Sequence, residues 1–240
     1  MIRILNLHEN LIESKMRPLT CVETKVVHLL NTYNLAIANK NVEYYRLLAS
    51  SEHNFVDGML LKVALSKRFR TNVYQYRGIN LMKTILSNPQ NGNSHLFICP
   101  DERNSLHLAI QIGRIYPQLK CEFIVPVFSN DLDRLRKDIY QKIGDTKFDY
   151  IWVGIGTPKQ DFLAQQLSLF SHGSYILCIG AALEFLAGTK AEAPILFQNM
   201  GLEWLFRFIQ EPRRLFKRYF IDSWGFIPLM ARETIELVAK

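Results

Sequence analysis

Short hydrophobic runs alternate along this chain with longer segments in which hydrophobic and polar residues mix. Hydrophobic runs with polar ends indicate buried strands, and we expect such strands within residues 24–34, 94–102, 119–129 and 174–180. Residues 53–69 and 148–170 each indicate a strand, a tight turn and a helix. The alternation predicts an α/β fold, with a mostly parallel sheet covered by helices on both faces.

The mixed segments predict where helices begin and end. We expect helices over residues 35–51, 103–117 and 130–144, the second of which stops near Pro117. Asn130 or Asp131 is a plausible N-cap for the third. The most hydrophobic segment, 174–188, predicts a strand that runs into a loop.

Polar residues follow most of the expected strands. In a parallel sheet, ligands bind outside the carboxyl ends of the strands, so these residues are the candidates for a site. They are Thr32, Asn34, Asp57, Pro100, Asp101 and the segments 156–160 and 180–184.

The turn "VGIGTPKQ" at residues 153–160 invites comparison with two nucleotide-binding motifs. A dinucleotide fingerprint fails because Lys159 stands at the third glycine position and the next strand has no acidic residue before Glu184. A P-loop fails because no Gly-Lys-Ser/Thr follows. We therefore expect no nicotinamide cofactor.

The same turn fits a T-x-x-Q capping box, with Thr157 as N-cap, Pro158 at the first helical position and Gln160 at the third. The helix would then direct its first amides at the ligand edge, where they could hold an anion. A well-capped helix without a ligand fits the pattern equally. Asp57 has two interpretations as well: a residue of an Asp-Gly turn, or a general base at a strand end.

From about residue 191 the chain becomes aromatic and basic. We expect an α/β domain over residues 1–195 and a helical appendage over residues 196–240, called the C-terminal segment below. Between Arg207 and Arg218 this segment carries one acidic residue, Glu211, and five cations: Arg207, Arg213, Arg214, Lys217 and Arg218. We expect Pro212 to interrupt the helix. A solvated amphipathic helix and a phosphate clamp at a membrane surface both remain open, and Trp and Tyr beside Arg favour the membrane.

Composition narrows these options. The 240 residues are 48% hydrophobic, and the net charge of +7 suits anionic partners. The four cysteines are far apart, so we expect free thiols and neither a metal site nor a disulfide. We see no secretory signal and no segment long enough to span a bilayer, so we expect a soluble or peripheral protein. The basic charge also suits nucleic acid, but it is concentrated in one segment and no nucleic-acid motif is visible, so nucleic acid is not an expected partner.

Three motifs together resemble the WecG/TagA/CpsF family of glycosyltransferases. They are "VGIGTPKQDF", "AGTKAEAP" and "GLEWLFRFIQEPRRLFKRY", supported by "VDGMLL" and "TYN", and the resemblance runs from about Thr32 to Tyr219. It implies a Rossmann-like fold with a C-terminal appendage over the active site. It also implies inverting transfer from a UDP-sugar to a polyprenyl-diphosphate-linked sugar, without a metal cofactor, in the assembly of teichoic acid, capsule or exopolysaccharide. Such an enzyme would be cytoplasmic and peripheral on the inner face of the membrane; a homo-oligomer stays open.

The resemblance assigns roles to residues of this chain. Asp57 matches the proposed catalytic base, Thr32 a threonine near the reacting sugar, and Gln160 the glutamine of the P-x-Q-E element. The residues expected around the UDP-sugar are Asn34, Arg77, Gly156, Thr157, Pro158, Lys159 and Glu184. Those expected to hold the acceptor diphosphate are Arg207, Arg214, Lys217 and Arg218.

Several positions depart from the family pattern around the donor pocket. Gln75 stands at the usual arginine position, and Arg77, two places on, could compensate. Glu184 replaces an aspartate, "ICPDERN" replaces a glycine-rich turn, and Glu192 stands where a cation is usual. The departures leave the donor sugar open. They also motivate an alternative: a nucleotide- or lipid-diphosphate-binding module that has lost catalysis.

Overall fold

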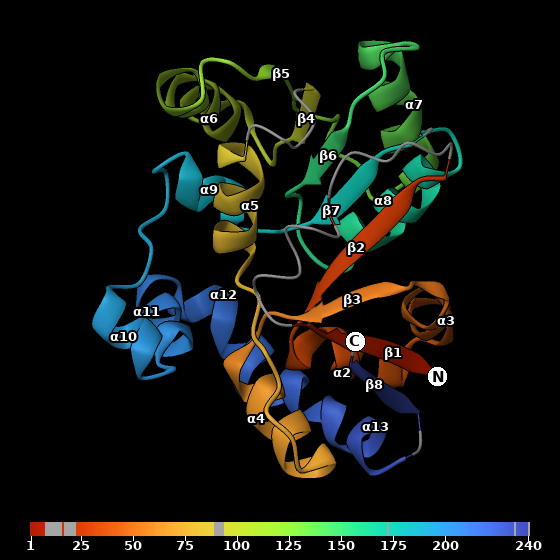
Figure 1. Ribbon diagram of the computed structural model, residues 1–240, viewed down its shortest axis with the longest axis vertical. Helices are drawn as coiled ribbons and strands as arrows, with labels where there is room; N and C mark the ends of the chain where they lie inside the picture. The colour runs from red at the N-terminus through yellow and green to blue at the C-terminus, as the bar shows by residue number, and fades with distance from the viewer. Residues whose placement is uncertain (8–15, 17–22, 89–93, 172, 233, 240) are drawn as a thin grey trace.

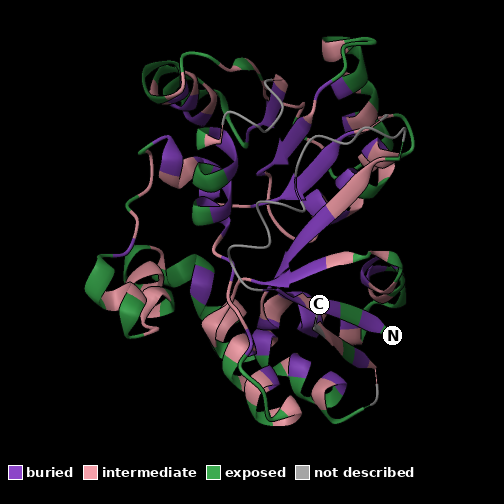
Figure 2. Ribbon diagram, viewed as in Figure 1, coloured by how far each residue is buried: buried purple, intermediate pink, exposed green. Residues whose placement is uncertain are grey.

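A computed structural model describes residues 1–7, 16, 23–88, 94–171, 173–232 and 234–239 of the chain. A six-stranded parallel sheet forms its centre, with strand order β3-β2-β7-β6-β4-β5. The strands are β2 (Lys25–Leu30), β3 (His53–Val56), β4 (Ser94–Ile98), β5 (Lys120–Ile124), β6 (Tyr150–Val153) and β7 (Tyr175–Cys178). The central strands β6 and β7 are buried on both faces (Figure 2), which explains why they are continuous hydrophobic runs.

Helices cover both faces of the sheet, as the alternating pattern predicts (Figure 1). Helices α5 (Gly78–Ser87), α6 (Glu102–Ile115) and α9 (Ala182–Leu186) enclose one core with the aromatic side chains of the central strands. Helices α7 (Leu132–Ile143) and α8 (Lys159–Ser168) enclose the other. The architecture is Rossmann-like.

A second, two-stranded sheet joins the two ends of the chain. Strand β1 (Ile2–Asn6) pairs in parallel with β8 (Ile235–Ala239), with Ile2 opposite Ile235. Its hydrophobic side chains share a core with α2 (Thr32–Lys40), α3 (Val42–Ser50) and α4 (Met59–Phe69). The hydrophobic pattern did not predict these two strands.

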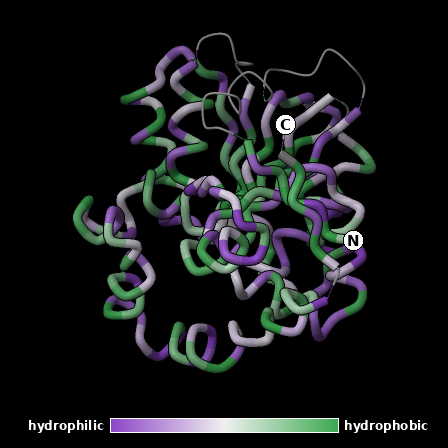
Figure 3. The backbone as a smooth tube through the Cα atoms, turned by 60° about the horizontal axis from the view of Figure 1, so that its bottom comes forward, coloured by the Kyte–Doolittle hydropathy of each residue, from purple (hydrophilic) through white to green (hydrophobic). Residues whose placement is uncertain are grey.

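The C-terminal segment forms short helices beside the carboxyl ends of the strands (Figure 1). They are α10 (Ile195–Asn199), α11 (Glu203–Gln210), α12 (Pro212–Lys217), a π-helical turn (Arg218–Asp222), a 3-10 turn (Ser223–Phe226) and α13 (Ile227–Ala231). Pro212 begins α12 and separates it from α11, which confirms the expected interruption. Along these helices hydrophobic and hydrophilic residues alternate over short distances (Figure 3).

Two expected elements differ from the structure. The single helix expected over residues 35–51 is two helices, because Asn41 is extended (φ −126°, ψ 110°) and its side chain accepts the backbone N–H of Tyr44 at 2.9 Å. The loop expected after β7 contains the short helix α9, which buries Leu183 and Leu186 against the sheet.

Other expectations are confirmed. Asp131 caps α7 by accepting the backbone N–H groups of Asp133 and Arg134, and α6 ends at Ile115, just before Pro117. Cys99, Cys121 and Cys178 are free thiols; Cys21 lies outside the described residues. Among the described residues, no helix combines the length and hydrophobicity needed to cross a bilayer.

Candidate active site

A cavity of about 520 Å³ lies where the carboxyl ends of the strands meet the C-terminal segment; we call it the strand-end cavity. The sheet contributes Asn31 after β2, Asp57 after β3, Pro100 after β4, and residues 154–157 and 179–182 after β6 and β7. The C-terminal segment contributes Glu203, Arg207, Glu211, Arg214 and Arg218. This is the edge at which parallel α/β sheets bind their ligands.

Asp57 lines this cavity, directly after β3. Its backbone N–H donates to the carbonyl of Leu30 at 2.8 Å, and its Oδ1 accepts the backbone N–H of Gly78 at 3.3 Å. Burial raises the pKa of the Asp57 carboxyl to about 6, helped by the negative charge of Glu203 and opposed by Arg207. A carboxyl with this pKa takes up or releases a proton close to neutral pH, as a general base must.

Local packing and backbone geometry explain why the "VGIGT" turn contains two glycines. A Cβ on Gly154 would lie 2.5 Å from Leu183 Cδ1, so only glycine lets helix α9 approach this closely. Gly156 has a φ of +91°, in the region that other residues rarely adopt. The first glycine therefore serves close packing and the second serves the geometry of the turn.

The expected capping box at this turn is wrong. Helix α8 begins at Lys159, and Pro158 precedes it without a side-chain cap. Gln160 does reach back, but its Oε1 accepts the N–H of Gly156 at 3.1 Å, and Thr157 Oγ1 accepts Gln160 Nε2 at 3.5 Å instead of a backbone N–H. Gly156, Thr157 and Gln160 border the cavity, whereas Lys159 lies over the ring of Phe128 at 5.3 Å.

Thr32 and Asn34 lie in the first turn of α2 and are buried behind the cavity wall. Asn34 donates to the hydroxyl of Tyr44 at 2.8 Å and accepts the N–H of Asn31 at 3.1 Å. The residue of this region that borders the cavity is Asn31, which sequence reasoning missed. Its signal was available, because Asn31 is the first polar residue after the hydrophobic run "VVHLL".

Arg77 is held by the C-terminal part of the chain. Its guanidinium forms ion pairs with Glu192 at 2.8 Å and Glu203 at 2.9 Å, and donates to Gln198 Oε1 at 2.6 Å. Gln75 donates instead to the backbone carbonyl of Asp57 at 2.5 Å. The unusual acidic residue at position 192 is therefore the partner of the unusual arginine at position 77.

Two arginines of the C-terminal segment face the cavity without a carboxylate partner in the described part of the chain. Arg207 lies over the ring of Phe185 at 5.4 Å, and Arg218 over the ring of Tyr33 at 4.4 Å. Burial and neighbouring arginines lower the pKa of Arg218, and its Nε is buried without a hydrogen-bond partner among the described residues. Such groups are ready to bind an anion.

The other cations are occupied or lie elsewhere. Arg214 pairs with Glu211, and Lys190 bridges Glu184 at 3.2 Å and Glu211 at 2.6 Å. Lys217 is exposed and does not border the cavity. Lys190, Glu203 and Glu211 are further cavity residues that sequence reasoning did not select, because only the fold brings them to the strand ends.

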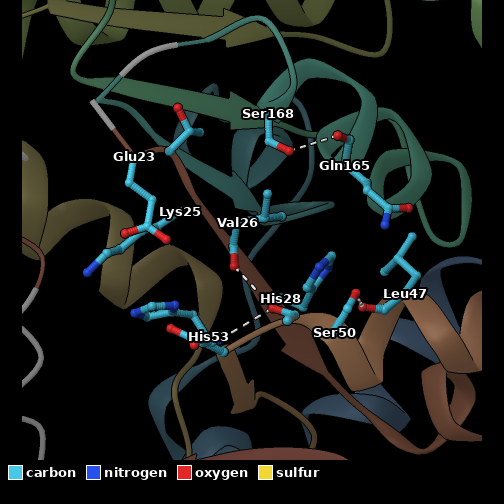
Figure 4. A pocket seen from close by; sticks show the side chains of 12 residues that line it. Glu23, Lys25, Val26, His28, Leu47, Ser50, His53, Gln165 and Ser168 are labelled. Carbon is cyan, nitrogen blue, oxygen red and sulfur yellow. Dashed lines mark hydrogen bonds between the residues drawn. The ribbon is translucent and has the colours of Figure 1, made fainter. Parts of the chain in front are cut away.

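Three side chains of metal-ligand type lie together beneath the turn: His28, Asp161 and Cys178. They are better described as a hydrogen-bonded cluster, because Asp161 Oδ1 lies 2.8 Å from His28 Nδ1 and Oδ2 accepts the hydroxyl of Tyr44 at 3.0 Å. His28 also borders a smaller cavity of about 280 Å³ at the amino ends of β2 and β3, between α3 and α8 (Figure 4).

A parallel α/β sheet with a carboxyl group at its strand ends, facing arginines of a second segment, is typical of enzymes acting on phosphorylated substrates. The sequence identifies the family. Residues 2–239, essentially the whole chain, match the description "Glycosyl transferase WecG/TagA/CpsF family". The chain therefore belongs to this glycosyltransferase family of cell-surface polysaccharide biosynthesis, as the three motifs indicate.

Proposed function

We propose that this protein transfers a sugar from a UDP-sugar to a polyprenyl-diphosphate-linked saccharide, with inversion at the anomeric carbon. The observation that carries the proposal is the arrangement of the strand-end cavity, which is lined by Asp57 and by Arg207 and Arg218, two arginines without a carboxylate partner among the described residues. A base and phosphate-binding groups in the same cavity are what such a reaction needs.

In this proposal, Asp57 removes the proton from the acceptor hydroxyl as that oxygen attacks the anomeric carbon. The bond from this carbon to the UDP oxygen breaks, and UDP leaves with the electron pair. The pKa of Asp57, about 6, leaves the carboxylate ionised at neutral pH and still basic enough to assist. Thr32 and Asn34, behind the wall, would support the turn around the donor.

The leaving diphosphate needs positive or N–H groups to stabilise its charge. The turn at Gly156 and Thr157 borders the cavity on the sheet side, and we assign it, with Glu184, to the UDP-sugar. Arg207 and Arg218 border it on the side of the C-terminal segment, and we assign them, with Arg214, to the acceptor diphosphate.

We further propose that the C-terminal segment brings the cavity to the membrane surface at which a polyprenyl acceptor lies. Its helices expose large hydrophobic side chains beside the basic ones. They are Ile195, Leu196, Met200, Trp204, Ile209, Phe216, Phe220, Ile221, Trp224 and Ile227.

The test is a donor screen against a synthetic polyprenyl-diphosphate-sugar acceptor, read by mass spectrometry. We expect one UDP-sugar to extend the acceptor by one residue, and NMR of the product to show an inverted anomeric configuration. Turnover that survives unchanged in Asp57→Asn would refute the assignment of the base. Binding of UDP without transfer or hydrolysis from any donor would favour the alternative of a binding module.

A further inference from the structure

A chain of buried hydrogen bonds leads from the sheet to the wall of the strand-end cavity. His28 Nδ1 lies 2.8 Å from Asp161 Oδ1, and Asp161 Oδ2 accepts the Tyr44 hydroxyl at 3.0 Å. Asn34 Nδ2 donates to the Tyr44 oxygen at 2.8 Å and to Thr157 Oγ1 at 3.5 Å. His28, Asp161, Tyr44 and Asn34 are 0–1% exposed, so water does not compete for these hydrogen bonds.

Two backbone N–H groups fix the orientation of the side-chain amides of Asn34 and Gln160. The N–H of Asn31 donates to Asn34 Oδ1, and the N–H of Gly156 donates to Gln160 Oε1, each at 3.1 Å. Because a backbone N–H can only donate, the oxygen of each side-chain amide is identified, and its nitrogen must face the other way. Both nitrogens then donate to Thr157 Oγ1 at 3.5 Å.

The hydrogen bond between Tyr44 and Asp161 supports the same donor-to-acceptor direction along these buried side chains. Burial, together with the negative charge of Asp161, raises the pKa of Tyr44 far above its usual range, so this phenol remains protonated and can donate. The oxygens of a carboxylate only accept, which directs the Tyr44 hydrogen to Asp161 and leaves the Tyr44 oxygen free to accept from Asn34.

Thr157 is the last residue of this series of hydrogen bonds, and its hydroxyl hydrogen is not used within the series. Its oxygen accepts two N–H groups, and its hydroxyl hydrogen has no acceptor among the residues that the structure describes. Because Thr157 borders the strand-end cavity, the remaining direction for that hydrogen is toward the cavity.

We propose that the buried chain makes the Thr157 hydroxyl a donor that holds a phosphate oxygen of a nucleoside diphosphate in the cavity, with Tyr44 and Asp161 as positioning residues. This inference deepens the proposed function and rests on it. It specifies that Thr157 donates the hydrogen bond and the ligand accepts it, so that Thr157 selects for an acceptor oxygen. The orientation of its hydroxyl depends on Tyr44 and Asp161, which do not touch the ligand.

The first experiment compares Thr157→Val with Thr157→Ser in the full-length protein, with UDP as the probe in calorimetric titrations. Valine keeps the shape but removes the hydroxyl, whereas serine retains it. We expect the valine variant to bind UDP about tenfold more weakly and the serine variant to stay within about threefold. Equal affinities for the two variants would overturn the inference.

The second experiment separates positioning from general stability. Tyr44→Phe removes one buried hydroxyl from the chain, and Tyr150→Phe is its matched control, because Tyr150 donates to the carbonyl of Met16 outside the chain. We expect Tyr44→Phe, but not Tyr150→Phe, to weaken UDP binding about three- to tenfold. Combining Tyr44→Phe with Thr157→Val should add no further loss, since both act through one hydroxyl; fully additive losses would count against the inference.

A ligand-free readout keeps the two proposals distinguishable. We expect Tyr44→Phe to shift the side-chain amide resonances of Asn34 in NMR spectra, and Tyr150→Phe to leave them in place. Unshifted Asn34 resonances in Tyr44→Phe would refute the hydrogen bond between Tyr44 and Asn34 on which the proposed series depends. If the unaltered protein binds UDP but transfers no sugar, the transferase proposal fails alone; if it does not bind UDP, the ligand assigned to Thr157 is wrong as well.

Discussion

At the scale of single residues, the pKa of Asp57 links activity to stability. The carboxylate must be ionised to act as a base, so we expect kcat/KM to rise with pH through about 6 and then level. Replacing Asp57 by Asn removes the proton acceptor and should lower kcat by about 10²–10⁴-fold, while UDP binding stays within a few-fold. A pH profile that is flat between 5 and 8 would contradict the assignment.

The same substitution should stabilise the fold at neutral pH. A carboxyl whose pKa is about 6 in the folded protein and about 4 in the unfolded chain binds protons more tightly when folded, so its ionisation costs stability as the pH rises from about 4 to 6. We therefore expect Asp57→Asn to be about 1–2 kcal/mol more stable than the unaltered protein at pH 8, and about equal to it at pH 4. Urea denaturation at the two pH values measures this difference.

Arg218 and Arg213 offer a matched pair on the C-terminal segment. Arg218 borders the cavity, and its buried Nε has no hydrogen-bond partner in the part of the chain that the structure describes, whereas Arg213 is exposed and outside the cavity wall. We expect Arg218→Gln to raise the KM for a polyprenyl-diphosphate acceptor at least tenfold, because it removes a charge-assisted hydrogen bond to phosphate. Arg213→Gln should change the KM less than twofold. Similar effects of the two substitutions would indicate a general role for positive charge.

Site residues whose position is set by their neighbours in the sequence could be predicted. The positions of Asp57 and Gly156 at strand ends follow from the hydrophobic run that precedes each of them, and the structure places both at the cavity. Thr32 and Asn34 also follow a strand, but helix α2 begins immediately and turns them into the interior. Arg77 and Glu192 are 115 residues apart, and their pairing depends on the folded arrangement.

At the scale of secondary-structure elements, Arg77 fastens α10 and α11 to the sheet domain. Its side chain is largely buried and contacts Glu192, Gln198 and Glu203 at once. Arg77→Gln would leave these acceptors partly unpaired, so we expect the free energy of unfolding to fall by about 1–3 kcal/mol. Amide hydrogen exchange in α10 and α11 should become faster.

Arg3→Gln is the control for this prediction, because Arg3 pairs with Glu236 where both side chains are exposed. We expect that substitution to change stability by less than about 0.5 kcal/mol. If Arg77→Gln behaves like Arg3→Gln, the contacts of Arg77 do not fasten these helices.

Elements, too, differ in how far the sequence predicts them. Pro212 marks the break between α11 and α12 by its own chemistry, since it has no N–H for the preceding helix. Strands β1 and β8 gave no such signal. Each is a five-residue segment that becomes a strand by pairing with the other end of the chain, and pairing over such a distance is decided by tertiary packing.

At the scale of the whole molecule, the C-terminal segment belongs to the core as well as to the surface. Phe226, Leu229 and Ile235 are buried in the same cluster as Ile2 and Ile4. Deleting the segment would therefore expose this core and unfold part of the sheet domain, so loss of activity after truncation would reveal little about the membrane. Surface substitutions are the sharper test.

Phe216 and Ile221 are suitable positions for that test, because their side chains are 54% and 58% exposed on the C-terminal segment. Leu106 and Ile110 provide the control, since they are 62% and 59% exposed on α6, away from the segment. We would replace each pair by serine and measure sedimentation with vesicles of phosphatidylglycerol and phosphatidylcholine. Inserting two large hydrophobic side chains contributes about 3 kcal/mol or more, so the first variant should bind vesicles at least tenfold more weakly.

The control variant should bind these vesicles like the unaltered protein, and both variants should retain turnover on a short-chain, water-soluble acceptor, because none of the four residues borders the strand-end cavity. Binding should also weaken with salt and with a lower content of phosphatidylglycerol, since the net charge of the chain is +7. Equal losses in the two variants would mean that exposed hydrophobic residues act without regard to position, and would refute a membrane surface on the C-terminal segment. A selective loss would mean that the helices closing the cavity also orient it toward the lipid acceptor.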